Sequence, residues 1–448
     1  MILLRALVPI LLWLACLAAC TGQIPVTRAP FTPDSGTLAV RCGRLIDGLS
    51  DQVRSDQTVL IVDGVIREIV SSGQSAHDAP LLDLSGHVCL PGLIDMHTHV
   101  TDRAGDTADL KSFYTRTQAN QDEISRIIAE KTLMAGFTSV RNVGAYPGWT
   151  GTRIRDQVDA GQVAGPRIQS AGFYLTIPGG GGDLVIPGVP EEEIPPHVRM
   201  GVARGAEAFG EKARAVVEGG ADLIKVIASG AVLAYGGVPG EPEMTAEEIA
   251  AVVEVAHAAG LKVAAHAHGA RSIKEAIVAG ADTIEHASLI DDEGIALALR
   301  HGVALAMDVY NGDYIEAEGR RQGWPEEFLR KNAETTEAQR QSFSRAHQAG
   351  VTIVFATDSG VYPHGDNARQ FAIMVERGMT PMEAIRSATS RAARVMGRDD
   401  VGALEPGRLG DLIAVTRDPL ADIRALESVD VVIKGGLLFK PPSPEAHK

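Results

Sequence analysis

Two histidine pairs stand out because each pair has a single residue between its two histidines and lies at the end of an apolar run. His97 and His99 end LIDMHTH, and His266 and His268 lie in AAHAHG. Alternate residues of a strand face the same side, so each pair can direct two imidazoles to one place. A single histidine there would usually be a satisfied core residue, whereas two in register favour a metal site.

Three further residues with unusual chemistry lie in other apolar runs. Lys225 falls within DLIKVIAS, His286 within IEHAS and Asp358 within FATDSG. A charged lysine is costly to bury, so Lys225 either reaches out to solvent or is a neutral amine that has captured carbon dioxide. The carbamate formed in that way is a two-oxygen anion that suits two divalent metals. Together with the histidine pairs, these residues predict a metal site.

The elements that carry these residues repeat a pattern of helix, glycine and apolar strand. Six joints show it: LMAGFTSVRNV, VEGGADLIKVIAS, AAGLKVAAHAHG, VAGADTIEHAS, RHGVALAMDV and QAGVTIVFATDSG. Apolar strands that alternate with helices indicate a parallel sheet buried on both faces. CLPGLIDMHTH and PRIQSAGFYLT bring the count to eight, which favours an α/β fold of the (β/α)8 TIM type over an open doubly wound sheet. The active site of such a barrel lies at the C-terminal strand ends.

Both ends of the chain have a different sequence pattern from the middle, where helices alternate with strands. Residues 37–90 read as short strands and turns, and similar strands return near the C-terminus in DLIAVT and VDVVIKGGLLF. We therefore predict a small discontinuous β-sandwich domain from 37–90 and 400–440, around a barrel of 91–399. Two cysteines of this body, Cys42 and Cys89, fall in strand-like segments. The sequence leaves open whether they pair or are buried free thiols.

The N-terminus predicts export. Residues 1–19 contain one early cation, Arg5, followed by an apolar run of signal-peptide length. The run ends in LAAC, which resembles the lipobox of bacterial lipoproteins, so Cys20 would be the lipidated first residue and 20–36 a tether. A plain secretory signal is the alternative. We expect a periplasmic or outer-membrane-anchored protein of the cell envelope, which touches the membrane only through Cys20.

The net charge of −15 argues against nucleic acid as a partner, because phosphate binding needs a basic face. The oligomeric state stays open, with a homo-oligomer among the possibilities. The expected partner is a small-molecule substrate.

The motifs PGLIDMHTH, AAHAHG, IEHAS, ATDSG and GALEPGRLGDLIAV, together with the buried Lys225, resemble the metal-dependent amidohydrolase superfamily. The similarity runs from about residue 37 to 440. Within the superfamily the chain is most similar to the Xaa-Pro dipeptidase and imidazolonepropionase-like group, which includes amidases that act on ochratoxin-type conjugates. The resemblance implies a binuclear hydrolase of C–N bonds. One departure is PGGGGD, in which Gly181 stands where many relatives have a histidine, so a substrate preference cannot be carried over.

The resemblance also implies the roles of individual residues. One metal would be held by His97, His99 and Asp358, and the second by His266 and His286. Zinc is the expected metal, although manganese, iron or cobalt also suit these ligands. Two such metals lower the pKa of a shared water, and Asp358 would be the general base that passes a proton to the leaving nitrogen.

Carboxylated Lys225 would bridge the two metals. His268 would lie beside them or face the substrate. Arg141, after TSV, could grip a substrate carboxylate, or form a structural ion pair. Tyr235, in VLAYGGVPG, could bind a carboxylate or an oxyanion, or be an ordinary loop tyrosine. His364 could line the mouth of the barrel.

The sequence thus predicts hydrolysis of an amide or peptide bond in a dipeptide or N-acyl amino acid. The alternative is hydrolysis of a cyclic amide, as in imidazolonepropionase-like enzymes. Deamination is disfavoured by Lys225, because deaminase-like relatives usually hold one metal and lack that lysine. A non-catalytic binding relative is the remote alternative, since such proteins typically lose ligands that are all present here.

Overall fold

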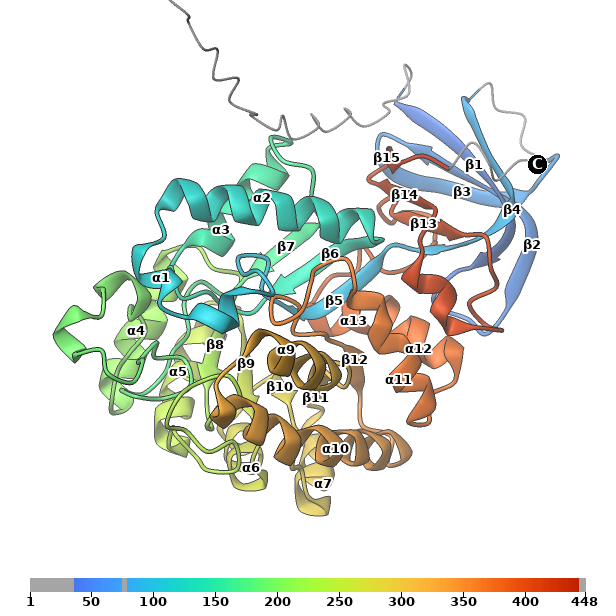
Figure 1. Cartoon of the computed structure of the whole chain (residues 1–448). Coiled ribbons are helices and arrows are strands. Elements are labelled where there is room, and N and C mark those ends of the chain that lie inside the picture. The colour runs from blue at the N-terminus through green and yellow to red at the C-terminus, as the bar shows by residue number, and fades with distance from the viewer. Residues whose placement is uncertain (1–35, 75–78, 443–448) are drawn as a thin grey trace, which may run out of the picture.

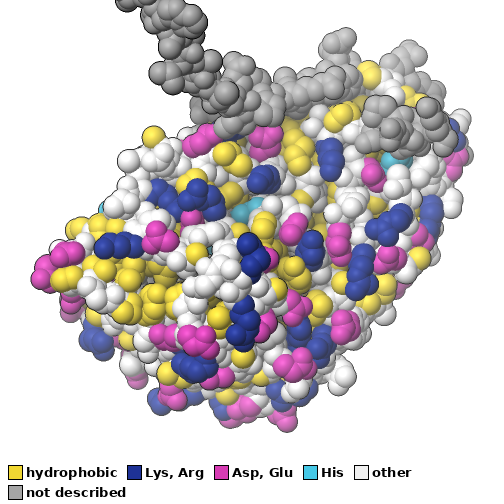
Figure 2. Space-filling view, in the orientation of Figure 1, with side chains coloured by type: hydrophobic (Ala, Val, Ile, Leu, Met, Phe, Trp, Pro, Cys, Tyr) yellow, Lys and Arg dark blue, Asp and Glu magenta, His cyan; other side chains and the backbone are white. Residues whose placement is uncertain are grey.

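The computed structural model describes residues 36–74 and 79–442, and it shows a β-domain beside a larger α/β unit (Figure 1). The predicted signal peptide, the anchor at Cys20 and all but the last residue of the tether lie outside the described residues. Among the described helices, none combines the length and apolar character that a membrane crossing requires. Acidic and basic side chains are mixed over the face shown in Figure 2, with no broad area of one sign.

Eight parallel strands form the core of the larger unit. In chain order they are β5 (Leu93–Thr98), β6 (Phe137–Asn142), β7 (Arg167–Ser170), β8 (Leu223–Ile227), β9 (Lys262–Ala267), β10 (Thr283–His286), β11 (Ala304–Met307) and β12 (Ile353–Phe355). Their ladders form two arcs, β5-β6-β7 and β8-β9-β10-β11-β12. Isolated parallel bridges join the arcs at both seams, from Thr98 to Ser359 and from Leu175 to Val226. The predicted TIM-type fold is confirmed.

Helices surround these strands (Figure 1). They are α1 (Ser112–Thr115), α2 (Gln118–Met134), α3 (Thr150–Asp159), α4 (Ala206–Glu218), α5 (Ala246–Ala258), α6 (Ala270–Ala279), α7 (Asp292–His301), α8 (Asn311–Tyr314), α9 (Arg320–Gln322), α10 (Glu326–Gln348), α11 (Gln370–Glu376), α12 (Pro381–Ser387) and α13 (Ser390–Met396). Short 3-10 turns are η1 (Asp106–Asp109), η2 (Glu191–Glu193), η3 (Pro196–Val198), η5 (Asn367–Arg369) and η6 (Ile423–Glu427), and η4 (Ile315–Gly319) is a π-helix.

The glycine joints end helices as the sequence predicts. Gly280 after α6 and Gly302 after α7 are left-handed, with φ of 99° and 69°. Glycine adopts this conformation without a Cβ penalty. Each of these helices therefore stops where the next apolar strand must begin, which brings the strand ends to one rim.

The two ends of the chain form one seven-stranded sheet. Its strands are β1 (Thr37–Ile46), β2 (Val53–Val62), β3 (Val65–Ser71), β4 (Leu81–Pro91), β13 (Leu412–Val415), β14 (Val431–Lys434) and β15 (Leu437–Lys440), in the order β15-β14-β13-β4-β1-β2-β3. An isolated bridge joins Val65 at the β3 edge to Leu409, just before β13. Alternate residues such as Val40, Ile61 and Leu412 form one buried core. The predicted small β-domain built from both ends of the chain is thus a single continuous sheet around one buried core.

A disulfide joins Cys42 on β1 to Cys89 on β4, with the Cα atoms 5.8 Å apart. Both cysteines are fully buried in the core of the β-domain. The structure therefore shows the pair that the sequence left open. The bridge ties two neighbouring strands across a separation of 47 residues.

Replacing both cysteines, as Cys42→Ala with Cys89→Ala, is expected to lower the free energy of unfolding by ~2–4 kcal/mol, because a cross-link restricts the unfolded chain. Chemical denaturation of the double variant and the parent measures this loss. Metal content and turnover should not change, since the bridge lies in the β-domain. Equal stability of the two proteins would show that the bridge adds nothing.

Candidate metal centre and active site

A cavity of about 160 Å³ opens at the C-terminal ends of the barrel strands. Seven of the residues that the sequence singled out line it: His97, His99, Lys225, His266, His268, His286 and Asp358. Two groups within this set have ligand atoms that all lie within 4.8 Å of one another, namely His266, His268 and His286, and His97, His286 and Asp358. The strand ends therefore gather a donor set that could hold metal ions.

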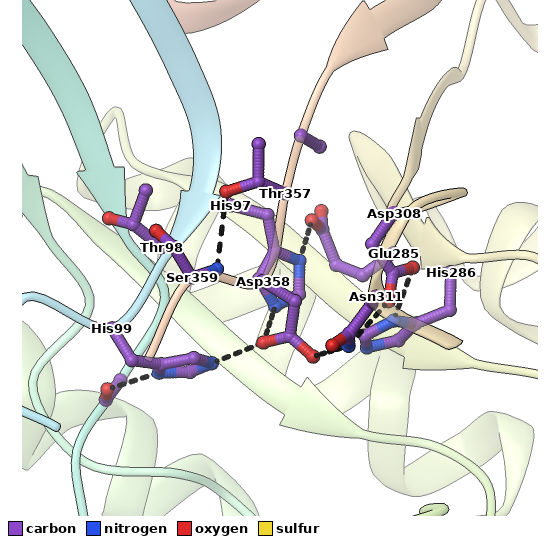
Figure 3. A network of polar contacts seen from close by, with 12 residues as sticks. His97, Thr98, His99, Glu285, His286, Asp308, Asn311, Thr357, Asp358 and Ser359 are labelled. Carbon is purple, nitrogen blue, oxygen red and sulfur yellow. Dashed lines mark hydrogen bonds and ion pairs between the residues drawn. The ribbon is translucent and has the colours of Figure 1, made fainter. Parts of the chain in front are cut away.

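Buried carboxylates orient two of the imidazoles (Figure 3). His97 Nδ1 lies 2.7 Å from Glu285 Oε2, and His286 Nδ1 lies 2.9 Å from Asp308 Oδ1. The pKa of each carboxyl is lowered: burial raises it, but the charge of Arg141 outweighs that effect at Glu285, and the contact with the His286 imidazole outweighs it at Asp308. An ionised carboxylate only accepts, so both rings carry their proton on Nδ1 and present Nε2 as the free ligand atom.

His99 is oriented in the same way by a backbone carbonyl. Its Nδ1 lies 3.1 Å from Gly144 O, which can only accept, so Nε2 is free. Figure 3 shows that Nε2 turned toward Asp358, at 3.1 Å from Oδ1. The neighbouring His97 Nε2 lies 3.4 Å from the same oxygen. The two imidazoles of the first pair and one carboxylate oxygen therefore converge on one point.

Asp358 is held by a second contact and by its backbone. Asn311 Nδ2 donates to Asp358 Oδ2 at 3.1 Å, which leaves Oδ1 to the two histidines. Asp358 has φ of 56°, a left-handed conformation that non-glycine residues rarely adopt. Burial would raise the pKa of this carboxyl, but its contacts with the imidazoles of His97 and His99 outweigh that effect and hold the pKa well below its usual range. The carboxylate therefore stays ionised.

Lys225 is buried without a compensating contact. Its side chain is 2% exposed, and Nζ has no hydrogen-bond partner among the described residues. Burial lowers the pKa of the amine to about 8. A lysine with no partner is costly in such a place, and its amine lines the same cavity as the histidines. The orphaned amine and the donor chemistry around it fit the metals that the sequence predicts.

The second histidine pair offers two candidate ligands. His266 Nε2 lies 3.4 Å from Gly230 O, a contact that leaves Nδ1 free, whereas His268 Nδ1 lies 2.8 Å from Ser288 Oγ. Burial holds the pKa of His266 well below its usual range and that of His268 at about 3. Both rings are therefore neutral, as metal ligands must be. The choice of His266 as the ligand remains a prediction.

Arg141 forms a structural ion pair, which was the alternative to a role in binding the substrate carboxylate. Its side chain is buried, with Nη2 2.7 Å from Glu285 Oε1 and Nε donating to Met96 O at 2.6 Å. It does not line the cavity. Arg141 therefore braces the carboxylate that orients His97, and this guanidinium is not available to a substrate.

Tyr235 and His364 also lie outside the cavity lining. The half-buried Tyr235 ring packs on Phe328, with centroids 4.8 Å apart. His364 is buried, and its Nε2 lies 3.1 Å from His99 O. His364 thus supports the backbone of a predicted ligand instead of lining the mouth.

Sequence reasoning did not single out Glu285 and Asp308. Glu285 directly precedes His286 in IEHAS, and Asp308 directly follows β11. A carboxylate at the end of an apolar strand was therefore an available signal in both cases. Their partners could not be read from the chain, because Glu285 reaches His97 across the barrel and Asp308 reaches His286 on the neighbouring strand.

Asp308→Ala is expected to weaken metal affinity about 10–100-fold, the usual effect of removing a carboxylate that orients a ligating histidine. His286 would lose the acceptor for its Nδ1 proton. Competition with a chromogenic chelator measures the affinity. Asp313→Ala is the control, since Asp313 pairs with Arg340 outside the cavity lining. Equal affinities for the two variants would contradict this role of Asp308.

The chain resembles known proteins over nearly its whole length. Residues 88–438 match the model of the amidohydrolase family. Ochratoxinase of Aspergillus niger is 30% identical over 444 residues, covering 92% of this chain and 88% of that protein. Imidazolonepropionase of Haloarcula marismortui is 24% identical, covering 90% and 95%. A solved Xaa-Pro dipeptidase with bound methionine in its active site is 36% identical, with a TM-score of 0.84 and coverage of 90% and 100%.

Proposed function

The chain belongs to the amidohydrolase family, and from that premise we propose that it hydrolyses the amide bond of a dipeptide or an N-acyl amino acid. The convergence of the predicted ligands on one cavity supports catalysis over mere binding. Ochratoxinase and the Xaa-Pro dipeptidase, two of its relatives, support this substrate class.

We propose that two divalent ions, zinc by preference, occupy the cavity. His97, His99 and Asp358 would hold one ion, and His266 and His286 the other. These donors include all of one group of ligand atoms that lie within 4.8 Å of one another, His97, His286 and Asp358, and two members of the other, His266 and His286. Neutral imidazole and carboxylate suit zinc and its neighbours among the transition metals.

Lys225 would lie between the ions as a carbamate. Carbamylation replaces an orphaned buried amine with an anion that two cations can neutralise. The low pKa of the Lys225 amine favours this reaction, because only the neutral amine attacks carbon dioxide. This assignment explains why the barrel buries a lysine whose amine has no hydrogen-bond partner in the described part of the chain.

When bound, such ions supply an acidic water and polarise the substrate carbonyl. Residues of the chain transfer the proton of that water. Asp358 Oδ1, which faces His97 and His99, would go to the metal, so the proton is accepted on Oδ2, the oxygen that Asn311 Nδ2 contacts. Asp358 then returns the proton to the leaving nitrogen, which must be protonated to depart as an amine.

The test is a screen of purified, metal-reconstituted protein. The panel contains Xaa-Pro and other dipeptides, N-acyl amino acids, an ochratoxin-type aryl amide and a cyclic amide. Release of a free amino acid from linear substrates, lost after chelation and restored by metal, is expected. Turnover of the cyclic amide alone would favour the imidazolonepropionase-like alternative, and no turnover with full metal occupancy would contradict a hydrolase.

We also propose that Cys20 carries a lipid that holds the protein at the cell envelope. The supporting observation is LAAC at 17–20, outside the described residues. Mass spectrometry of the mature N-terminus tests the modification. Release of a Cys20→Ser variant from the membrane fraction is expected, and an unmodified N-terminus at another residue would contradict the anchor.

A further inference from the structure

The cavity needs a cation if its substrate has a free carboxylate. Arg141 and Tyr235 do not line the cavity, so neither of the predicted groups meets this need. Among the described residues that do line it, the lysine and arginine cations are Lys225 and Arg103. Lys225 lies among the predicted metal ligands, which leaves Arg103.

The Arg103 guanidinium uses only some of its hydrogen-bond donors in contacts with other described residues. Its Nε and Nη2 donate to Asp106 Oδ1, at 3.2 and 3.1 Å. The Nη1 group makes no hydrogen bond within the described ranges 36–74 and 79–442, and the side chain is 57% exposed. A guanidinium with a free edge at a cavity mouth can receive a carboxylate from solvent.

Asp106 does not fully neutralise Arg103, because the Asp106 carboxylate also binds a second arginine. Arg116, whose side chain is buried, binds the same carboxylate in a bidentate manner, with Nη2 2.7 Å from Oδ1 and Nη1 3.1 Å from Oδ2. One carboxylate therefore serves two guanidinium groups. A second carboxylate of this corner, Asp102, accepts from Thr101 Oγ1 at 2.9 Å and also lines the cavity. The Asp106 carboxylate holds Arg103 at the mouth without neutralising it fully.

An aromatic wall runs from this corner, where the Arg116 guanidinium lies 4.4 Å from the centroid of the Phe113 ring, to the predicted metal ligands. The ring of Phe113 lies 5.3 Å from Tyr146, Tyr146 lies 5.1 Å from Tyr174, and Tyr174 lies 6.0 Å from His99, as centroid distances. All four residues line the cavity. Aromatic faces of this kind bury apolar groups well. A ligand that reaches from Arg103 to the metal ligands passes along this wall.

We propose that Arg103 binds the free carboxylate of the substrate, and that the Phe113–Tyr146–Tyr174 wall receives the apolar side chain next to that carboxylate. The inference rests on the proposed function and narrows it to substrates that end in an apolar amino acid with an unblocked carboxyl group. Positioned in this way, the scissile amide lies toward His99 and the other predicted ligands.

Binding of two product-like probes tests the proposal independently of turnover. L-Phenylalanine and L-phenylalaninol differ only in the carboxylate, and calorimetry on the metal-loaded protein gives both affinities. Tighter binding of phenylalanine is expected. Arg103→Gln should lower that affinity about 10–100-fold, as for loss of a charged hydrogen bond, and should leave phenylalaninol unchanged. Arg126→Gln, which removes a partly exposed arginine on α2 outside the cavity lining, is the matched control.

Steady-state kinetics then distinguish a role of Arg103 in substrate binding from a purely structural role. With an N-acyl phenylalanine, Arg103→Gln should raise KM and leave kcat nearly unchanged, because the contact is the same in ground and transition states. Arg103→Lys should recover part of the loss. Equal affinity of the parent for both probes, or equal losses for both probes in Arg103→Gln, would overturn the proposal. A parent that prefers phenylalanine but cleaves no amide would refute the proposed function and leave the carboxylate site standing.

Discussion

Asp358→Asn is expected to lower kcat by about 10³-fold, within the range that general acid–base catalysis contributes. The amide keeps an oxygen that can face His97 and His99, and its size lets the contact with Asn311 persist after an amide rotation. It cannot accept the proton that must reach the leaving nitrogen. Steady-state kinetics on the best substrate of the screen, with metal content measured on the same samples, gives the result.

The metal content of Asp358→Asn determines how a loss of turnover in this variant is interpreted. If Asp358→Asn keeps both metals and loses turnover, the carboxylate acts in proton transfer. If turnover falls only in proportion to metal, Asp358 is a ligand and not the base. Asp109→Asn is the control, since Asp109 is an exposed carboxylate of η1 on the loop after β5. Near-parental kcat in metal-loaded Asp358→Asn would contradict the assignment.

The sequence predicts the barrel and its rim of polar residues well, and the reason is local. Strand alternation places His97 and His99 on one face, and left-handed glycines such as Gly280 end helices at the start of strands. Periodicity and glycine placement depend on neighbours in the chain. The predicted ligands therefore line one cavity, although strands far apart in the sequence carry them.

Contacts between distant strands could not be predicted in this way. Arg141 follows a strand end as a substrate-binding residue might, yet its guanidinium pairs with Glu285, 144 positions later. That pairing depends on which side chains of β6 and β10 meet inside the barrel. Hydrophobic alternation is the same for a substrate-facing and an inward-facing arginine, so it could not separate the two roles.

The β-domain shows the same limit. Strands at both ends of the chain were predicted, but their ladder order was not. β13 pairs with β4, more than 300 positions earlier, which makes one sheet out of two sets of strands. The register that brings Cys42 and Cys89 together depends on the pairing of β1 with β4, so the sequence left the disulfide open.

Lys225→Met is expected to abolish most activity, by about 10³-fold or more, which corresponds to ~4 kcal/mol of transition-state stabilisation. Methionine fills the space of the lysine stem without an amine, so no carbamate can form. Metal content per chain should fall as well. The free energy of unfolding of the metal-free protein should stay equal or rise, because an unpaired buried amine is replaced by an apolar group.

A second buried lysine, Lys331, provides a control for the proposed role of Lys225 as a metal-bridging carbamate. Lys331 is 1% exposed like Lys225, but its Nζ donates to Ala234 O at 2.7 Å and lies 2.7 Å from Glu327 Oε1. Lys331→Met should therefore lower stability while metal content stays near that of the parent, the reverse of Lys225→Met. Carbon-13 bicarbonate supplied during metal loading should give a carbamate resonance in the parent and in Lys331→Met, and none in Lys225→Met. A parent that binds two metals without this resonance would show that the amine does not bridge them as a carbamate, and the orphaned Lys225 would need another partner.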